Sequence, residues 1–244
     1  MTKIALITGA NRGLGLETAR QLARDHGFIV ILGARDLQKG EAAAQELRES
    51  DLDAHAVQLE VSDSHSVERA AREVEEKFGH IDVLINNAGV SPEYAAGQLS
   101  PSKLPLDLFR QILDTNLFGA FAVLRAFVPL LEKSPAPRVV NVSSAVGSLE
   151  SQSNPDSPYY GINTLAYNSS KTALNSLTIA FAKEFKDSPM KINSACPGWV
   201  KTDLGGAEAT REIEDGPRIF VTLATLPADG PTGQFFNEAG PIAW

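Results

Sequence analysis

Short apolar runs alternate with longer amphipathic segments along the entire chain. The apolar runs, which we expect to be strands, are Lys3–Thr8, Phe28–Leu32, Ala54–Leu59, Ile81–Ile85, Arg138–Val142, Lys191–Ala195 and Gln234–Phe236. The segments with apolar residues at helical spacing are Arg12–Asp25, Asp36–Ser50, Ser62–Phe78, Leu106–Leu131, Asn163–Phe185 and Ala209–Leu223. Strands that are apolar throughout and separated by helices are typical of a parallel sheet covered on both faces. The pattern therefore predicts an α/β fold built on a doubly wound parallel sheet.

The 244 residues run on without a linker, a repeat of fixed period or a shift in composition. We therefore expect a single domain that spans residues 1–244. Residues 150–161 (ESQSNPDSPYYG) are rich in Ser, Pro and Asn, which predicts a loop inserted into that domain.

Charge and cysteine content exclude several classes of protein. The chain carries 30 acidic and 22 basic side chains, a net charge of −8, whereas nucleic-acid binding needs a basic surface. Its single cysteine, Cys196, allows no intramolecular disulfide, so we expect a reducing compartment, the cytoplasm. The four histidines lack the spacing of metal ligands, so no metal site is expected. We expect no membrane partner either, because the start of the chain has neither a signal peptide nor a long apolar run.

The first expected strand leads directly into T-G-A-N-R-G-L-G, residues 8–15. Its glycines, Gly9, Gly13 and Gly15, are spaced G-x-x-x-G-x-G rather than G-x-G-x-x-G. Glycine permits a tight turn and lets the backbone approach a pyrophosphate, whose charge the N-terminus of the next helix then holds. Because the strand–turn–helix context is the one that such a motif requires, the segment predicts nucleotide binding.

Arg35 lies just after the second expected strand, where dinucleotide-binding folds read the 2′ position of the adenosine ribose. A carboxylate there binds a ribose diol, whereas an arginine binds a 2′-phosphate. Arg12, in the glycine turn, adds a second guanidinium, and two arginines suit a phosphate dianion. Asp36 follows Arg35, but it can equally cap the next helix. We therefore expect NADP rather than NAD; the alternative is that both arginines are solvated surface charges.

Tyr167 and Lys171 are spaced i, i+4 within a predicted helix, so both lie on one face. A neighbouring ammonium favours the phenolate form of a tyrosine, which can then exchange a proton with a carbonyl or alcohol oxygen near neutral pH. Ser143 and Ser144 end the fifth expected strand, at the edge where doubly wound sheets bind ligands. A serine hydroxyl there would reach the same substrate oxygen.

Two further polar features point to the same edge. The segment N-N-A-G, residues 86–89, ends the fourth expected strand. Asn116 is a polar residue in an otherwise apolar helical segment, where its amide requires a partner. The alternative for Asn116 is an ordinary position on the surface of the helix.

These motifs resemble those of the short-chain dehydrogenase/reductase family over nearly the whole chain. T-G-A-N-R-G-L-G, N-N-A-G, N-V-S-S, Y-N-S-S-K and P-G-W-V-K-T-D occur in the family's order. The resemblance implies a Rossmann fold and a catalytic tetrad of Asn116, Ser144, Tyr167 and Lys171. In that tetrad Tyr167 is the general acid and Ser144 polarises the carbonyl. Lys171 lowers the pKa of Tyr167 and holds the nicotinamide ribose, while Asn116 holds a water that links Lys171 to solvent.

The resemblance also implies a cofactor site drawn from several segments. Its residues would be Gly9, Asn11, Arg12, Gly13, Leu14, Gly15, Arg35, Glu60, Val61, Asn87, Ala88, Gly89, Tyr167, Lys171, Pro197, Gly198, Val200 and Thr202. Glu60 departs from the family, which usually has an aspartate before the valine, so we expect an altered contact with adenine.

Within the family, the chain is most similar to monomeric NADPH-dependent carbonyl reductases. A-R-D after the second strand, C-P-G-W-V-K-T-D-L from Cys196 and G-P-T-G-Q-F-F-N-E near the C-terminus carry this likeness. Ser144 and Tyr167 are further apart than is common in the family, because residues 150–161 lie between them. Similar reductases carry an insert there that covers the helical face used for oligomerisation, which implies a monomer.

The implied activity is NADPH-dependent reduction of an aldehyde or ketone. Two alternatives stay open, namely oxidation of a secondary alcohol with NADP and a cofactor-binding regulator with little catalysis. The segments expected to form the substrate pocket are Val90–Gln98, Val146–Leu149, Tyr159 with Tyr160, and Trp199–Ala207. Their apolar side chains indicate a fairly apolar carbonyl compound.

Overall fold

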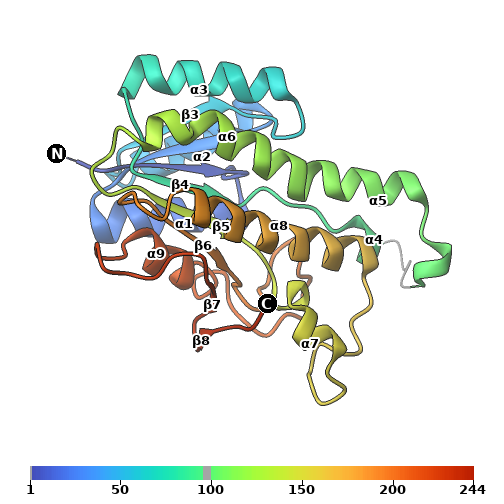
Figure 1. The fold of residues 1–244 in the computed structure, drawn as a ribbon. Coiled ribbons are helices and arrows are strands. Elements are labelled where there is room, and N and C mark those ends of the chain that lie inside the picture. The colour runs from blue at the N-terminus through green and yellow to red at the C-terminus, as the bar shows by residue number, and fades with distance from the viewer. Residues whose placement is uncertain (1, 96–99) are drawn as a thin grey trace.

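The computed structural model describes residues 2–95 and 100–244, and it confirms the predicted α/β fold (Figure 1). Within these residues, eight strands form one sheet in the order β3-β2-β1-β4-β5-β6-β7-β8. The strands are β1 Ile4–Thr8, β2 Ile29–Ala34, β3 Ala54–Gln58, β4 Val83–Asn86, β5 Arg138–Val142, β6 Lys191–Ala195, β7 Phe235–Asn237 and β8 Gly240–Pro241. Every pair from β3 to β7 is parallel, and only β8 runs antiparallel to its neighbour.

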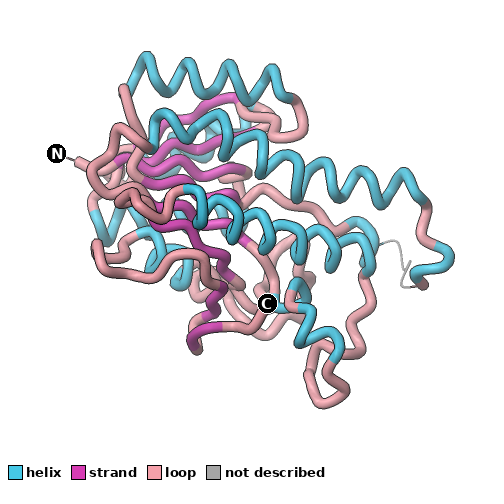
Figure 2. The backbone as a smooth tube through the Cα atoms, viewed as in Figure 1, coloured by secondary structure: helices cyan, strands magenta, loops and turns pink. Residues whose placement is uncertain are grey.

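Helices cover both faces of this sheet (Figure 2). They are α1 Gly13–His26, α2 Leu37–Arg48, α3 Ser64–Phe78, α4 Pro92–Ala95, α5 Leu106–Leu113, α6 Ala120–Leu131, α7 Leu149–Ser153, α8 Leu165–Glu184 and α9 Arg218–Ala224. Two short 3₁₀ turns, η1 Pro101–Lys103 and η3 Ala145–Gly147, and a π-helical segment, η2 Asp114–Gly119, complete the helical elements. The arrangement is the doubly wound one that the alternating pattern predicts.

Successive strand residues point to opposite faces and supply two separate cores. Ile7 of β1 packs on one face with residues of α1, α2 and α9, and Phe220 of α9 is fully buried there. Leu6 packs on the other face with residues of α3, α6 and α8, and Phe127 of α6 is fully buried there. Both layers hold the strands so that their carboxyl ends lie along one edge.

The segment predicted as one helix over Leu106–Leu131 is helical throughout but changes type in its middle. α5 and α6 are joined by the π-helical residues Asp114–Gly119. Gly119 lies so close to the segment after β3 that a Cβ on it would stand 2.8 Å from Val61 Cγ2. A π-helical insertion rotates the side chains that follow and is frequent at functional sites, and a periodicity of 3.6 residues does not reveal it.

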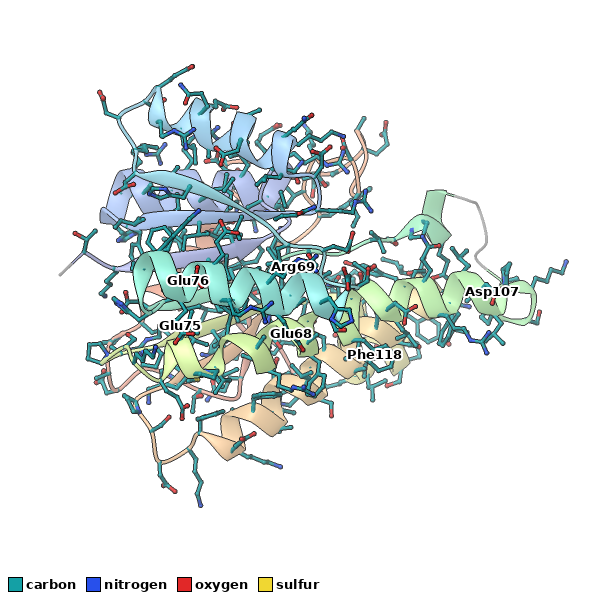
Figure 3. All side chains as sticks on the ribbon, turned by 90° about the horizontal axis from the view of Figure 1, so that it is seen from above. Glu68, Arg69, Glu75, Glu76, Asp107 and Phe118 are labelled. Carbon is teal, nitrogen blue, oxygen red and sulfur yellow. The ribbon has the colours of Figure 1, made fainter. Side chains whose placement is uncertain are left out.

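The same segment is long and apolar enough to cross a membrane by length and composition, with a mean hydropathy of 1.3. In the structure 39% of its most apolar stretch is buried, and α6 packs against α3 and β4. Val123 and Leu124 are completely enclosed in the core. Phe118, labelled in Figure 3, and Phe121 are exposed instead. α6 is therefore packed into the core, while the segment leaves apolar side chains at the surface.

Two other predictions need correction, and one short strand was not predicted. The last predicted helix, Ala209–Leu223, begins only at Arg218, because Arg211 pairs with Val200 in an isolated bridge and Pro217 is the N-cap residue of the helix. The predicted loop over residues 150–161 includes part of a short helix, α7, whose N-cap Ser148 accepts a hydrogen bond from Ser151 N (3.1 Å). The two-residue strand β8 was not predicted, since two residues carry no period.

Candidate active site

The segments that follow β1, β4, β5 and β6 come together at the carboxyl ends of these strands (Figure 1). β1 lies between β2 and β4, so the order of the strands reverses at this point. Doubly wound sheets bind ligands in the crevice outside such a switch point. The predicted site residues lie on these segments, on the segments after β2 and β3, on η2 and on α8.

The glycine turn packs tightly against the N-N-A-G segment. Gly9 and Gly13 have φ of +64° and +60°, a backbone conformation that favours glycine. A Cβ on Gly15 would lie 2.6 Å from Asn87 Nδ2 and 2.7 Å from Gly9 O. Asn87 Nδ2 donates to Thr8 O at 2.8 Å. The two loops are therefore locked together, and Gly15 has no room for a side chain.

The N-terminus of α1 is open to an anion. Its N-cap residue, Arg12, makes no side-chain capping hydrogen bond, and the first turn contains no acidic residue. Amide groups in the first turn of a helix need an outside acceptor, for which a pyrophosphate is well suited. Asn11 lies in the same turn, and Leu14 packs against the core behind it. These residues fit the phosphates of a dinucleotide.

The two arginines predicted to bind a 2′-phosphate lie at the surface and already have acidic partners. Arg12 forms an ion pair with Asp203, and their side chains are 74% and 76% exposed. Arg35 is 84% exposed, and its Nε lies 3.6 Å from Glu60 Oε2. Exposed ion pairs of this kind are weak and exchange partners readily. Both guanidiniums are therefore accessible to a phosphate.

Two carboxylates close to Arg35 have structural partners. Asp36 Oδ1 accepts hydrogen bonds from Gln38 N (3.0 Å) and Lys39 N (3.3 Å), so Asp36 caps α2. Glu60 Oε1 accepts from both the backbone N (3.3 Å) and Oγ (2.9 Å) of Ser62. Of the two interpretations of Asp36, the structure thus supports the helix cap.

Asn116 is buried, with only 1% of its surface exposed, so the surface alternative is wrong. Its Oδ1 accepts from Val90 N (2.8 Å), and its Nδ2 donates to Val90 O (2.9 Å) and to Ser170 Oγ (3.0 Å). A Cβ on Gly89 would stand 3.5 Å from the same Oδ1. The side-chain amide therefore joins the segment after N-N-A-G to α8.

Lys171 is 3% exposed, and its Nζ donates to Val142 O at 2.8 Å. The same Nζ lies 5.5 Å from the centre of the Tyr167 ring. A Cβ on Gly89 would stand 3.6 Å from it, so N-N-A-G also borders the ammonium. Burial lowers the pKa of Lys171 to about 8. The ammonium is therefore fixed beside the ring of Tyr167 and can lose its proton near physiological pH.

Burial raises the pKa of Tyr167 above its ordinary value, the nearby Cys196 thiol adds to this, and a hydrogen bond with Ser144 lowers it. This burial outweighs the lowering by Lys171 that the resemblance implies. The phenol is therefore protonated, which is the form that a general acid needs.

Of the two serines, only Ser144 interacts with the Tyr167 hydroxyl. It is the N-cap residue of η3 and is partly accessible. Ser143 is 2% exposed, and its Oγ donates to Lys171 O at 3.5 Å. The structure therefore favours Ser144 over Ser143 as the substrate-facing hydroxyl, in agreement with the motif.

Cys196 directly follows β6 and is buried, with 4% of its surface exposed. Its Sγ accepts from Ala145 N (3.2 Å) and Gly198 N (3.4 Å), and burial raises the pKa of the thiol. Burial and then Cys196 also raise the pKa of Tyr159. The thiol joins the β5 and β6 loops, which agrees with its interpretation as a small buried residue.

The residues after Pro197 form a loop held by Arg211. Gly198 has a φ of +79°, and a Cβ on it would stand 2.8 Å from Arg211 Cδ. Val200, which is 3% exposed, pairs with Arg211 in an isolated parallel bridge. Thr202 Oγ1 accepts a backbone hydrogen bond within the loop at 3.0 Å. The loop therefore has a defined shape at the position expected for the nicotinamide.

Large apolar side chains lie exposed on the segments expected to bind substrate. Trp199 is 50% exposed, Leu204 47% and Tyr160 54%. Tyr159 instead packs against the buried cluster that contains Cys196 and Phe235. The predicted wall over residues 90–98 falls partly outside the described residues, since 96–98 are not among them.

Sequence reasoning missed two side chains that support the tetrad. Ser170 is fully buried and contacts Asn116, 54 residues away. Glu93 is 1% exposed, and it accepts a hydrogen bond from the backbone of Ala166, 73 residues away. Contacts over such separations leave no local periodicity, so only a known fold could have revealed them.

Comparisons with known proteins agree with this geometry. A family model described as short chain dehydrogenase matches residues 3–213. Carbonyl reductase [NADPH] 1 of Homo sapiens is 32% identical over 99% of this chain and 98% of its own. (+)-Neomenthol dehydrogenase of Capsicum annuum is 30% identical over 96% of this chain and 95% of its own. The crystal structure of NADPH bound carbonyl reductase from chicken fatty liver superimposes with a TM-score of 0.85 at 27% identity, covering 100% of this chain and 99% of that one.

Proposed function

The chain belongs to the short-chain dehydrogenase family, and from that premise we propose that it is an NADPH-dependent carbonyl reductase acting on a small aldehyde or ketone. Its relatives include carbonyl reductases, one of which has NADPH bound in its structure. NADP(H) is accordingly the cofactor, and the accessible guanidiniums of Arg12 and Arg35 suit its 2′-phosphate.

One observation carries the proposal, namely the convergence of four polar side chains on one point of the sheet edge. The Lys171 ammonium stands beside the Tyr167 ring, and Ser144 interacts with the Tyr167 hydroxyl. Asn116 fixes the segment that borders the ammonium. A protonated phenol next to a hydroxyl donor and a buried ammonium suits proton delivery to a carbonyl oxygen.

Each residue then has a distinct role. NADPH supplies the hydride when it is bound. Tyr167 donates its phenolic proton to the substrate oxygen, and Ser144 donates a hydrogen bond that orients the same oxygen. Lys171 stabilises the phenolate that Tyr167 becomes, because an ammonium favours a nearby anion. The exposed Trp199 and Leu204 suit an apolar substituent on the carbonyl compound.

The test is a screen of NADPH and NADH oxidation with aldehydes, quinones and ketones, run on the wild-type enzyme and Tyr167→Phe. Loss of the proton donor is expected to reduce kcat by about 10²-fold to 10⁴-fold while NADPH binding, followed by its fluorescence, stays unchanged. Thermal melting checks that the variant is folded. Near-wild-type rates in Tyr167→Phe would refute the mechanism, and a strong preference for NADH would refute the assignment of the cofactor.

Oxidation of a secondary alcohol with NADP is the second candidate. The name of the relative (+)-neomenthol dehydrogenase supports it, and the same four residues would serve the reverse reaction. Equilibrium constants and both KM values, measured for each alcohol–carbonyl pair found in the screen, distinguish the two directions. A protein that binds NADPH but turns over no carbonyl or alcohol would instead be a cofactor-binding regulator.

We further propose that the protein is a cytoplasmic monomer. The insert over residues 150–161 supports the monomer. Its α7 packs against η3, and Glu150 N donates to Trp244 O at the C-terminus at 3.2 Å. Phe118 and Phe121 are 56% and 40% exposed on another face. A dimer formed through that face would bury them, so they are the residues with which to test the monomer. Light scattering tests the monomer, and a dimer dispersed by Phe118→Ser would overturn it.

A further inference from the structure

Glu93 is a buried carboxylate bound to the backbone of the helix that carries Tyr167. It lies on α4, just after the N-N-A-G loop, and is 1% exposed. Its Oε2 accepts hydrogen bonds from Ala166 N (3.0 Å) and Tyr167 N (3.2 Å). Burying a carboxylate costs free energy unless it accepts hydrogen bonds, and these two bonds satisfy Glu93.

Helix α8 depends on this carboxylate for its N-terminal cap. The first amide groups of a helix have no partner inside the helix. The N-cap residue, Thr164, makes no capping bond, since its Oγ1 donates to Asn168 Oδ1 at 2.8 Å. Glu93 accepts from two of the orphan amides instead. A carboxylate also interacts favourably with the positive end of the helix dipole, and bonds to a charged acceptor are stronger than neutral ones.

The cap closes a ring of hydrogen bonds around the general acid. Asn116 binds both backbone groups of Val90 and donates to Ser170 Oγ at 3.0 Å. Ser170 Oγ donates to Tyr167 O at 2.7 Å, while Glu93 accepts from Tyr167 N. Two residues, Ser91 and Pro92, then connect Glu93 back to Val90. Side chains thus hold the backbone of Tyr167 at both its N–H and its C=O.

We propose that Glu93 is a positioning residue that sets the place of the Tyr167 phenol relative to Ser144 and the substrate oxygen. The inference rests on the proposed function, in which Tyr167 is the general acid. Glu93 acts through the backbone of α8 and does not itself touch the substrate. Displacing a catalytic group by about 1 Å can cost about 10²-fold in rate, so the first turn of α8 matters to catalysis as well as to stability.

The kinetic test compares Glu93→Ala with Glu93→Gln. Glu93→Ala removes the acceptor, and kcat is expected to fall about 10-fold to 100-fold with less than about a threefold change in KM for NADPH. Glu93→Gln keeps an oxygen in place, so it is expected to restore kcat to within about threefold of wild type. Equal kcat in Glu93→Ala and wild type would overturn the proposal, as would equal losses in both variants.

Thr164→Val is the matched control at the same helix end. It removes the buried hydroxyl that bonds Asn168 but leaves the amides of Ala166 and Tyr167 capped. It is expected to lower the melting temperature while kcat stays within about twofold. If Thr164→Val lowered kcat as much as Glu93→Ala does, general damage to α8 would explain both results and the proposal would fail.

Amide hydrogen exchange provides a readout that does not need turnover. The amides of Ala166 and Tyr167 are expected to exchange faster in Glu93→Ala than in wild type or Glu93→Gln, with the middle of α8 unchanged. Unchanged exchange would show that the cap is absent and would overturn the inference. If wild type reduces no carbonyl yet shows this protection, the proposed function fails and the cap stands, so the two failures are distinguishable.

Discussion

The catalytic end of the site and the end expected to bind the 2′-phosphate differ in how their polar side chains are held. Asn116 and Lys171 are 1% and 3% exposed, and both are held by hydrogen bonds to backbone carbonyls. Arg12 and Arg35 are 74% and 84% exposed and form ion pairs with Asp203 and Glu60. The catalytic end is therefore part of the protein core, whereas the end expected to bind the 2′-phosphate lies on the protein surface.

This difference indicates that the geometry of the catalytic residues is rigid, whereas the affinity for the cofactor phosphate is adjustable. Buried hydrogen bonds fix geometry before a ligand arrives, and breaking one leaves an unpaired group in the core. Exposed ion pairs contribute little and change partners at low cost. Substitutions at the catalytic end should therefore cause large losses of rate, whereas those at the phosphate end should cause modest changes in cofactor affinity.

The largest expected effect comes from Lys171→Met, which replaces the buried ammonium with an apolar side chain of similar length. Tyr167 then loses the cation that stabilises its phenolate, and kcat is expected to fall about 10²-fold to 10⁴-fold. Steady-state kinetics measures this at saturating NADPH. Lys183→Met, on the exposed side of the same helix, is the control and should leave kcat unchanged. A loss of less than about threefold in Lys171→Met would show that the buried end is not the sensitive one.

The next effect is on pH dependence. Because the pKa of Lys171 is lowered to about 8, its ammonium is present below that pH and lost above it. In the direction of reduction, kcat/KM is expected to be flat below about pH 8 and to fall about tenfold per pH unit above it. Tyr167 stays protonated over this range, since burial raises its pKa. A flat profile to pH 10 would contradict the role of Lys171.

A variant of Cys196 tests whether Lys171 or the buried thiol causes the alkaline decline. The pKa of Cys196 is raised by burial, so the thiol should keep its proton where Lys171 loses its own. Cys196→Ser is therefore expected to keep the alkaline decline, shifted to lower pH if at all, because Cys196 contributes to raising the pKa of Lys171. If the decline disappeared in Cys196→Ser, the titrating group would be the thiol rather than the ammonium.

The contrast between the two ends also explains how much could be predicted from the sequence. The parallel sheet and the layers of helices on both of its faces followed from apolar runs and their spacing, which are local signals. Tyr167 and Lys171 were predicted from their i, i+4 spacing. Asn116 was singled out as a polar residue in an apolar segment, although spacing alone left a surface position equally open. Each of these residues can be recognised from the residues that surround it in the sequence.

The parts that could not be predicted depend on contacts between distant segments. Glu93 caps α8 from 73 residues away, and no pattern near either partner records this. The raised pKa of Tyr167 follows from enclosure by several loops, whereas the spacing alone suggested a lowered value. The π-helical turn at Asp114–Gly119 was not predicted either, and its Gly119 lies close to Val61, which is distant in the sequence.

At the phosphate end, Arg35→Ala tests whether a surface charge sets the choice of cofactor. Loss of the guanidinium is expected to raise KM for NADPH about tenfold, with kcat and the KM for NADH unchanged. Arg24→Ala, which removes an exposed arginine paired with Asp25, is the matched control and should alter neither KM. Equal changes for the two cofactors would show that Arg35 does not read the 2′-phosphate.

The smallest effect, and the sharpest test of the exposed end, is expected from Asp203→Asn. Asp203 pairs with Arg12 and so competes with the cofactor phosphate for the same guanidinium. Neutralising it frees Arg12, and KM for NADPH is expected to fall about twofold to threefold, as suits an exposed pair. The gain should vanish at about 1 M salt, where screening removes surface attractions. Asp187→Asn, at the far end of α8, is the charge-matched control and should change nothing. A rise in KM for NADPH in Asp203→Asn would mean instead that the ion pair holds Arg12 in its binding position. The phosphate end would then be preorganised, as the catalytic end is.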